Sequence, residues 1–253
     1  MTKSLLCFLI ILNSTSSIGQ IATRLYGYDK NARLNQVSCN NINAISYSYD
    51  ALGNRIGKTI SQPKSLTMHV LLEGLYNPAS NQLNKAQNQT GDAFAGNVAD
   101  SITVELHQGI APYARTGSSY RAALLTSGQA SLQIPAISGQ YYLVVKHRNS
   151  VETWSASPVN LVPGTNVYDF TLHENAAFGA NLKSINGRYC IFSGDIDQDG
   201  AVDGLDMTLI RNMAAGFGTG YLAEDLNGDG VIDAIDMIIL DNNAAEFVGK
   251  MAP

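Results

Sequence analysis

Two acidic segments in the C-terminal part of the chain carry the side chains with the clearest chemical potential. Asp195–Asp206 and Asp225–Asp236 lie 30 residues apart and share the pattern D-x-[DN]-x-D-G-x-x-D-x-x-D. Each segment offers a side-chain oxygen at positions 1, 3, 5, 9 and 12, with glycine at position 6. Because the whole pattern recurs in register, we expect both segments to do the same chemistry.

Oxygen ligands at this spacing, around a glycine that permits a sharp turn, are what Ca²⁺ takes in twelve-residue loops. Positions 1, 3 and 5 supply side-chain oxygens, position 7 a backbone carbonyl, position 9 a direct or water-mediated ligand, and position 12 closes the site. The sequence therefore predicts two Ca²⁺ ions. Their predicted ligands are Asp195, Asp197, Asp199, Ala201, Asp203 and Asp206 in the first loop, and Asp225, Asn227, Asp229, Val231, Asp233 and Asp236 in the second.

The charge distribution supports a cation site. From Ile191 onward there are 12 acidic and 2 basic residues, a net charge of −10, and the rest has 14 basic and 9 acidic, a net charge of +5. Such an acidic block either repels itself into disorder or is neutralised by cations. Disorder would not require glycine at position 6 of both copies. No basic stripe is interleaved with aromatic residues, so a nucleic-acid partner is not expected.

The residues after each loop predict a helix. Leu205, Leu209 and Met213 follow the first loop at helical spacing, and Ile235, Ile239 and Ala244 follow the second, so we expect them to form the apolar faces. Apolar residues at loop position 8, Val202 and Ile232, are expected to pack the loops together. The units also share their ends, Ala-Ala-x-Phe at Phe217 and at Phe247.

Residues 192–248 resemble the dockerin type I module. A full EF-hand has Glu at position 12 and a helix before each loop, whereas this chain has Asp there and a strand-like Tyr189–Phe192 before the first loop. The resemblance implies a small helical domain with two EF-hand-like loops, and a protein partner. Cellulosomal dockerins bind cohesins mainly through positions 10 and 11, commonly Ser-Thr. Gly204-Leu205 and Ala234-Ile235 stand there, which disfavours a cohesin and favours docking onto this chain's own β-sandwich.

The middle of the chain predicts a β-sandwich. Short strand patterns separated by Gly, Pro and Asn turns recur over residues 64–173, among them 68–76, 101–106, 131–134, 141–147, 153–155 and 167–170. The predicted fold class is mainly β, an immunoglobulin-like or transthyretin-like sandwich followed by the small helical domain of residues 193–253. A hairpin at Asn186-Gly187 links the two within residues 174–192. Residues 67–250 resemble, more loosely, the C-terminal parts of Gram-negative surface or adhesin-like proteins.

The N-terminal part has two features. Residues 1–19 have the charged, apolar and small-residue regions of a signal peptide, and their apolar run is too short to span a bilayer. Tyr26-Gly27-Tyr28-Asp29 recurs 21 residues later as Tyr47-Ser48-Tyr49-Asp50, the pattern of a strand entering a tight turn. Residues 20–63, chiefly 24–60, therefore resemble a short remnant of the RHS/YD-repeat family, as two hairpins.

Other reactive residue types do not form a catalytic pattern. The four histidines, His69, His107, His147 and His173, lack metal-site spacing, and no serine lies in a nucleophile elbow. Glu73, Glu105 and Glu152 offer a carboxylate pair only as any domain of this size does. Cys39 and Cys190 either pair or stay as thiols. No catalytic residue and no enzymatic activity are predicted.

The sequence thus favours a secreted or cell-surface, non-catalytic Ca²⁺-binding protein whose dockerin-like module serves in surface anchoring or protein–protein interaction. The alternative is a non-catalytic accessory in polysaccharide catabolism, which binds carbohydrate or joins a cellulosome-like assembly. Trp154, with Tyr141, Tyr142 and Tyr168, would stack on sugar in that alternative, whereas a sandwich core also accounts for these residues.

Overall fold

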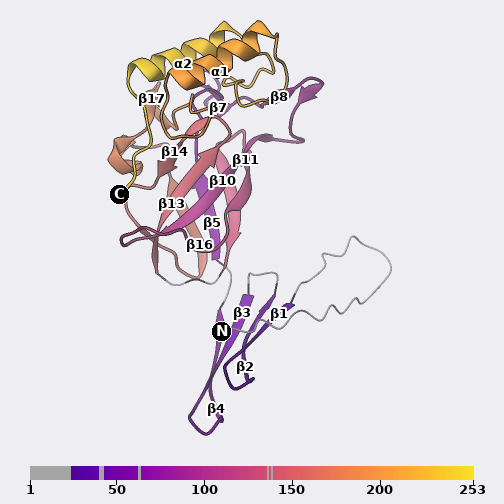
Figure 1. The fold of residues 1–253 in the computed structure, drawn as a ribbon, viewed down its shortest axis with the longest axis vertical. Helices are drawn as coiled ribbons and strands as arrows, with labels where there is room; N and C mark the ends of the chain where they lie inside the picture. The colour runs from indigo at the N-terminus through magenta and orange to yellow at the C-terminus, as the bar shows by residue number, and fades with distance from the viewer. Residues whose placement is uncertain (1–23, 40–42, 62–63, 136, 138) are drawn as a thin grey trace. The chain divides into compact units, whose positions relative to one another are not determined.

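The protein is mainly β with two helices near its C-terminus, which confirms the predicted fold class (Figure 1). The computed structural model describes residues 24–39, 43–61, 64–135, 137 and 139–253, and the predicted signal peptide lies outside them. The chain divides into two compact units. Strands β1 to β4 belong to the first unit, and most of the main sheet with both α-helices belongs to the second.

The first unit contains an antiparallel four-stranded meander, β1-β2-β3-β4. The two sequence repeats occupy equivalent places, because each ends a strand at an aspartate that closes the following turn. Asp29 Oδ1 accepts hydrogen bonds from the amides of Asn31 (2.9 Å) and Arg33 (3.0 Å), and Asp50 Oδ1 accepts one from Asn54 (2.8 Å). The strands are β1 (Arg24–Tyr28), β2 (Leu34–Cys39), β3 (Asn43–Tyr49) and β4 (Arg55–Ser61).

The main sheet joins eight strands in the order β14-β13-β10-β11-β12-β5-β16, with β15 paired to β13. Buried side chains alternate with half-buried or exposed ones along β5 and β12, whereas β13 is buried along most of its length. The strands are β5 (Lys64–His69), β10 (Val98–Gln108), β11 (Tyr120–Leu125), β12 (Gln129–Ile134), β13 (Gln140–His147), β14 (Ser150–Trp154), β15 (Val159–Asn160) and β16 (Gly164–Asp169).

Two strand predictions needed correction. The strand expected at residues 68–76 ends at His69, because the following apolar run leaves the sheet. There Leu71 O accepts the amide of Ile191 (2.8 Å), and Ile191 O accepts the amide of Glu73 (3.0 Å). The sequence did not predict β11, whose Ala122 and Ala123 are weak strand formers.

Smaller elements connect the sheet to the C-terminal segment. The predicted Asn-Gly hairpin is confirmed, since Asn186 (φ 50°) and Gly187 (φ 77°) both adopt the left-handed conformation that a type I′ turn needs. These elements are β6 (Tyr76–Asn77), β7 (Gln82–Leu83), β8 (Gln87–Asn88), β9 (Gly91–Asp92), the 3₁₀ helices η1 (Glu174–Ala176) and η2 (Phe178–Ala180), β17 (Lys183–Ile185) and β18 (Arg188–Cys190).

The helices α1 (Gly204–Ala215) and α2 (Ala234–Ala245) begin directly after loop position 9. Asp203 and Asp233 are their N-caps, and Asp206 and Asp236 complete capping boxes by accepting the N-cap amide. None of the helices in the described residues is long and apolar enough to cross a membrane.

The predicted apolar faces of these helices are partly wrong. Leu205 is 61% exposed and Ile235 53% exposed, whereas Ile210 and Leu240 are fully buried. The aspartate at loop position 12 sets the helix phase, because its buried carboxylate must turn toward the loop. Ile210 and Leu240 follow that aspartate by four residues and share its face, whereas position 11 precedes it by one residue and points away.

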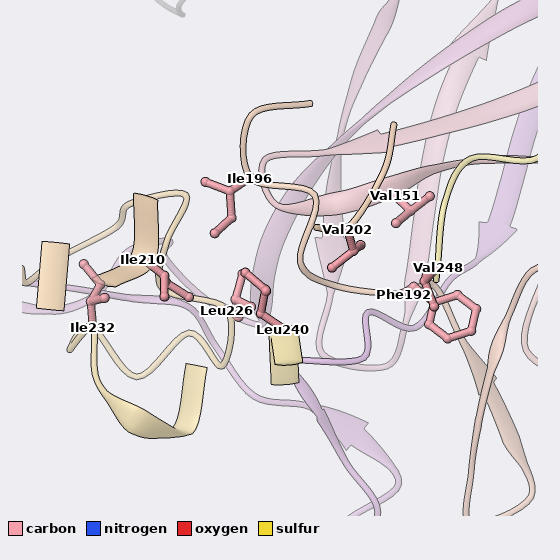
Figure 2. Packing of buried hydrophobic residues seen from close by; sticks show 9 residues of the cluster. All are labelled: Val151, Phe192, Ile196, Val202, Ile210, Leu226, Ile232, Leu240 and Val248. Carbon is pink, nitrogen blue, oxygen red and sulfur yellow. The ribbon is translucent and has the colours of Figure 1, made fainter. Parts of the chain in front are cut away.

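One apolar core joins the main sheet to the C-terminal segment (Figure 2). Val151 of β14 lies in the same buried cluster as residues from both loops and both helices, including Val202, Ile210, Ile232 and Leu240. The expected burial of Val202 and Ile232 is confirmed, with 3% of each exposed. The C-terminal segment therefore packs on the main sheet, but Leu205 and Ile235 do not make that contact.

The helix phase can be tested with two leucine-to-alanine substitutions. Leu240→Ala leaves a cavity in the shared core and should lower the free energy of unfolding by about 2–5 kcal/mol. Leu205→Ala, at an exposed position, should change it by no more than about 0.5 kcal/mol. Urea unfolding followed by fluorescence of the single tryptophan, Trp154, reports on the second unit. If both variants lost the same free energy of unfolding, the assigned phase of the helices would be contradicted.

Candidate metal centre

The two acidic segments fold into loops with the same hydrogen-bond scheme. In the first loop (Asp195–Asp206), Asp197 Oδ1 accepts the amide of Asp199 (3.1 Å), and Asp199 Oδ1 accepts the amide of Ala201 (2.8 Å). In the second loop (Asp225–Asp236), Asn227 Oδ1 accepts the amide of Asp229 (2.8 Å), and Asp229 Oδ1 accepts that of Val231 (2.9 Å). Each side chain of positions 3 and 5 is thereby held inside its own loop.

The glycine at position 6 turns each loop back on its first residue. Gly200 (φ 97°) and Gly230 (φ 81°) lie in the left-handed region, where a side chain would be strained. The amide of Gly200 donates to Asp195 Oδ1 at 3.4 Å, and the amide of Gly230 donates to Asp225 Oδ2 at 3.1 Å. The turn therefore brings position 1 close to positions 3 and 5.

Three carboxylates of the first loop converge on one point. Asp195, Asp197 and Asp199 each place an oxygen so that all three oxygens lie within 4.8 Å of one another. Oxygens bound to one Ca²⁺ at about 2.3–2.6 Å can be at most about 5 Å apart. The spacing therefore fits a calcium ion. In the second loop, Asn227 replaces one of the three carboxylates with an amide oxygen, which Ca²⁺ also accepts.

The aspartate at position 12 joins the start of each loop to the start of the helix. Asp206 Oδ1 accepts the amides of Ile196 (2.7 Å) and Asp197 (3.2 Å), and its Oδ2 accepts that of Asp203 (3.0 Å). Asp236 makes the equivalent three bonds to Leu226 (2.8 Å), Asn227 (3.0 Å) and Asp233 (3.0 Å). An ionised carboxylate has about four acceptor positions, so three amides leave capacity for a metal.

Position 7 ties each loop to the other repeat. Val231 of the second loop forms an antiparallel bridge with Thr219, just beyond α1, and Ala201 of the first loop forms one with Gly249, just beyond α2. Position 9 lies at the helix start, where Asp203 Oδ1 accepts the amide of Leu205 (2.7 Å) and Asp233 Oδ1 accepts that of Ile235 (2.7 Å). All twelve predicted ligand positions therefore lie on these two loops.

Burial makes the aspartate at position 1 of each loop a weaker acid than usual. Burial, together with the neighbouring carboxylates, raises the pKa of Asp195 and of Asp225 to about 6. Burial also raises the pKa of Asp206 and Asp236, against the effect of the amides that donate to them. Crowded, desolvated carboxylates are unfavourable by themselves, and a bound divalent cation offsets that cost.

The residues considered above for sugar binding or for catalysis do not belong to the two loops. Trp154 is only 7% exposed and packs beside His107 and Tyr142, so its ring is not open for sugar stacking. Lys146 bridges Glu105 (3.5 Å) and Glu152 (3.0 Å), and both glutamates have a lowered pKa because the hydrogen bonds and cations around them outweigh burial. A glycosidase acid needs a raised pKa. Burial raises the pKa of Glu73, but its Oε2 is held by the amide of Ser193 (2.9 Å) and by Asn243 Nδ2 (2.6 Å). Cys190 is a buried free thiol, and the side chain of Cys39 lies outside the described part.

Sequence reasoning missed the residues that hold the second loop from outside. Arg148 and Asn149, in the turn between β13 and β14, donate to Asp225 O at 2.9 Å each. They stand more than 70 positions before the loop, and no local pattern links them to it. The sequence also did not predict that Phe217 (89% exposed) and Phe247 (93% exposed) lie on the surface, although both end the repeated Ala-Ala-x-Phe pattern.

Two loop–helix units with calcium-type loops define a paired EF-hand-like module. The comparisons agree, since residues 193–245 match the family model of the dockerin type I domain, a calcium-binding, non-catalytic protein-interaction module. No curated protein matches the chain.

Two solved structures are similar to the chain at 16% sequence identity. One is a C-terminal interface mutant of a type II cohesin–X-dockerin complex from Acetivibrio cellulolyticus, with a TM-score of 0.43, covering 74% of this chain and 97% of that one. The other is an N-terminal interface mutant of such a complex from the same organism, with a TM-score of 0.38, covering 75% and 96%. With TM-scores below 0.5, both are too remote to establish a shared fold.

The raised pKa values predict proton-linked metal binding. Folding raises the pKa of Asp195 and Asp225 from 3.8 to about 6, so the metal-free fold holds protons that the unfolded chain releases. The contribution of these two groups to metal-free stability therefore decreases as pH rises from about 4 to about 6. Ca²⁺ must displace the same protons, so apparent affinity should weaken as pH falls through about 6.

Calorimetric titration of Ca²⁺ at pH 7.5 and pH 6, in buffers of different ionisation enthalpy, measures both effects. We expect proton release to be larger at pH 6 than at pH 7.5. An affinity and a proton release that do not change between the two pH values would contradict the assignment of Asp195 and Asp225 as ligands.

Proposed function

We propose that the C-terminal segment binds two Ca²⁺ ions, one per loop, and that calcium fixes a surface for a protein partner. The ligands of each ion are the side chains at positions 1, 3, 5, 9 and 12 and the carbonyl at position 7. The observation that carries this proposal is the set of hydrogen bonds that the two loops share, which orients the side chains at the same five positions in each loop. The dockerin match over residues 193–245 supports it.

The proposed docking surface consists of exposed apolar residues on α1, on α2 and just beyond them. Large apolar side chains rarely stay exposed in such number without a partner. Phe217 and Phe247 also carry positive φ values of 54° and 53°, which is unusual for a bulky residue and adds a strain cost to their exposure. The surface comprises Leu205 (61% exposed), Leu209 (37%), Phe217 (89%), Ile235 (53%), Ile238 (58%) and Phe247 (93%).

The partner we propose is a protein with an apolar patch edged by basic residues. With two Ca²⁺ ions bound, the segment from Ile191 onward would still carry a net charge of −6, from −10 and +4. Acidic surroundings of an apolar patch favour a partner of opposite charge. A cohesin is the usual partner of a dockerin, and the apolar residues at positions 10 and 11 would require a cohesin with a correspondingly apolar face.

The proposal also assigns a role to each of the other parts of the chain. Residues 1–19 would direct secretion, and extracellular Ca²⁺ would then keep the loops loaded. Residues 20–63 would be the YD-like hairpins, residues 64–173 the β-sandwich, residues 174–192 the linking hairpin and residues 193–253 the docking module. This organisation favours anchoring or interaction at the cell surface. The burial of Trp154 does not favour the alternative of carbohydrate binding.

Calcium titration of the whole chain tests the metal sites. We expect two bound ions and a rise in melting temperature with Ca²⁺ that a chelator reverses. Asp195→Ala and Asp225→Ala should each remove one ion, because each deletes the first ligand of one loop. The matched control is Asp241→Ala, an acidic residue on α2 outside both loops, which should keep both ions. Unchanged binding in both loop variants would refute the metal sites.

The docking surface is tested with the double variant Leu205→Lys/Ile235→Lys. Both side chains are exposed, so calcium binding and melting temperature should stay near those of the natural chain. A cohesin panel immobilised for surface plasmon resonance should show binding that requires Ca²⁺, and the double variant should reduce it at least tenfold. The control Arg121→Ala changes an exposed residue of β11, away from the proposed surface. Binding that persists with chelator or with the double variant would contradict this surface.

A further inference from the structure

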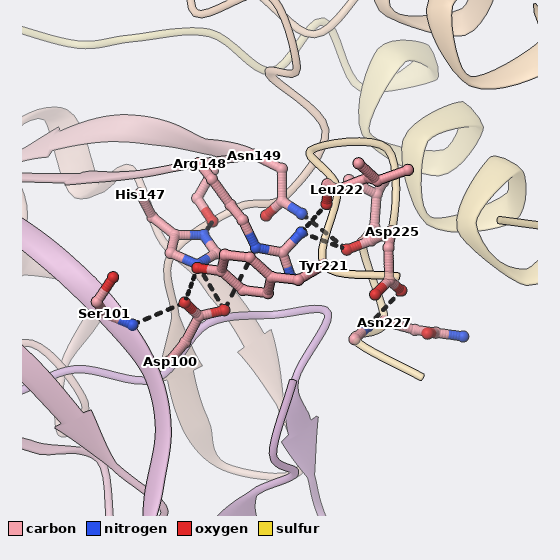
Figure 3. A network of polar contacts seen from close by, with 12 residues as sticks. Asp100, Ser101, His147, Arg148, Asn149, Tyr221, Leu222, Asp225 and Asn227 are labelled. Carbon is pink, nitrogen blue, oxygen red and sulfur yellow. Dashed lines mark hydrogen bonds and ion pairs between the residues drawn. The ribbon is translucent and has the colours of Figure 1, made fainter. Parts of the chain in front are cut away.

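The two loops differ in the groups that hold the carbonyl of their first residue. In the first loop, Asp195 O accepts a hydrogen bond from Gln198 Nε2, a side chain of the same loop. In the second loop, Asp225 O accepts hydrogen bonds from Arg148 Nη1 and Asn149 Nδ2, both at 2.9 Å. The donors to Asp225 come from the turn between β13 and β14 (Figure 3).

Position 4 explains why the second loop needs outside donors. Gly228 stands where the first loop has Gln198, so it has no side chain to donate. A larger residue there would force Leu75 to move, since a Cβ on Gly228 would lie 2.3 Å from Leu75 Cδ2, and it would be strained at the φ of 75° that Gly228 adopts. The carbonyl of Gly228 also accepts the amide of Gln87 at 2.9 Å. Residues before the main sheet's central strands therefore pack directly on this loop.

Arg148 is oriented by groups outside the loop. Its Nε donates to Asp100 Oδ2 at 3.4 Å, and its guanidinium lies 4.4 Å from the ring centroid of Tyr221. Tyr221 in turn donates its hydroxyl to Asp100, and Arg148 Nη1 also donates to Leu222 O. Figure 3 shows these side chains grouped between the main sheet and the second loop. Arg148 therefore keeps its position independently of a metal ion.

The charge of Arg148 is already balanced. Asp100 is fully buried, yet the hydrogen bonds from His147 and Tyr221 and the charge of Arg148 outweigh burial and lower its pKa to about 2, so it is ionised at neutral pH. His147 lies 3.2 Å from the same carboxylate, and burial lowers its pKa, which favours its neutral form. The Arg148–Asp100 pair thus adds no net charge beside the second loop.

The loops also differ in exposure. At positions 3 and 4, Asp197 and Gln198 are exposed in the first loop, whereas in the second Asn227 is half-buried and Gly228 is buried. A cavity of about 420 Å³ lined partly by Asn227 and Asp229 keeps the second loop's side-chain ligands reachable from solvent. The second loop is therefore the more rigidly supported one and still accessible to an ion.

We propose that Arg148 and Asn149 are positioning residues that hold the second loop in its metal-binding shape, so that the two calcium sites are not equivalent. The second site binds Ca²⁺ more tightly and fills first, and the first site, held by its own Gln198, fills second. Preorganisation favours binding because less conformational freedom is lost when the ion binds. This inference rests on the proposed calcium binding and goes beyond it in ranking the sites.

Coupling must act in both directions. If the β13–β14 turn favours calcium in the second loop, calcium in that loop stabilises the turn by the same free energy. The first loop also contacts this turn, since the amide of Gly194 donates to Asn149 O at 2.8 Å and Gln198 Nε2 donates to Ser150 O at 3.4 Å, but Asp195 O takes its hydrogen bond from Gln198 and not from the turn. Calcium in the second site should therefore protect the backbone amides of residues 147–150 from hydrogen exchange, and calcium in the first site should protect them less.

Calorimetric titration of the full chain with Ca²⁺ tests the ranking. We expect two steps, and Asp225→Ala should abolish the tighter one, whereas Asp195→Ala should abolish the weaker one. Arg148→Lys keeps a charge for Asp100 but loses the fork that reaches Asp225 O, and should weaken the tighter step by about tenfold, as expected for one lost hydrogen bond of about 1.4 kcal/mol. Asn149→Ala removes a single amide, should have a similar effect, and keeps the test possible if Arg148→Lys unfolds.

Gln198→Ala is the matched control, because it removes the donor to Asp195 O and should weaken only the other step. A purely structural role would lower the metal-free melting temperature without separating the two affinities. Two sites of equal affinity in the natural chain would overturn the ranking. So would Arg148→Lys and Asn149→Ala variants that weaken both binding steps equally or leave both unchanged. In either case the proposed calcium binding itself would stand. Absence of any bound ion would overturn calcium binding and the ranking together.

Discussion

The buried aspartate at the last position of each loop is the constraint on which the C-terminal segment depends. Asp206 and Asp236 each accept three backbone amides, two from the start of the loop and one from the N-cap of the helix. One carboxylate therefore closes the loop, begins the helix and fixes its phase. The burial of Ile210 and Leu240, and the exposure of Leu205 and Ile235, follow from that phase.

The same arrangement concentrates negative charge where water is scarce. Asp195 and Asp225 are almost completely buried, with other carboxylates close by, and their raised pKa values express the resulting cost. A divalent cation at the loop centre, as proposed above, would offset this repulsion by attracting all the carboxylates. The shared core around Val151 packs the loops and helices against the main sheet.

The carbonyl of the first residue is held by different groups in the two loops. The carbonyl of Asp195 is held by Gln198 of the same loop, which also donates to Ser150 O. The carbonyl of Asp225 is held by Arg148 and Asn149, and Arg148 is oriented in turn by Asp100 and Tyr221. A duplicated sequence has thus acquired unequal surroundings by packing against one main sheet. The exposed ends of the repeats stay similar, since Phe217 and Phe247 share both backbone conformation and exposure.

The sequence by itself determined the features that depend on neighbours along the chain. The shape of each loop, the helix after it and the Asn186-Gly187 turn depend on residues close together in the sequence, so the residue types alone predict them. Only the tertiary structure decided which side of each helix is buried, that Trp154 is enclosed, and that Arg148 reaches Asp225. These outcomes depend on contacts between distant segments, whose free energies are set by packing and by the burial of charge, and no short pattern encodes them.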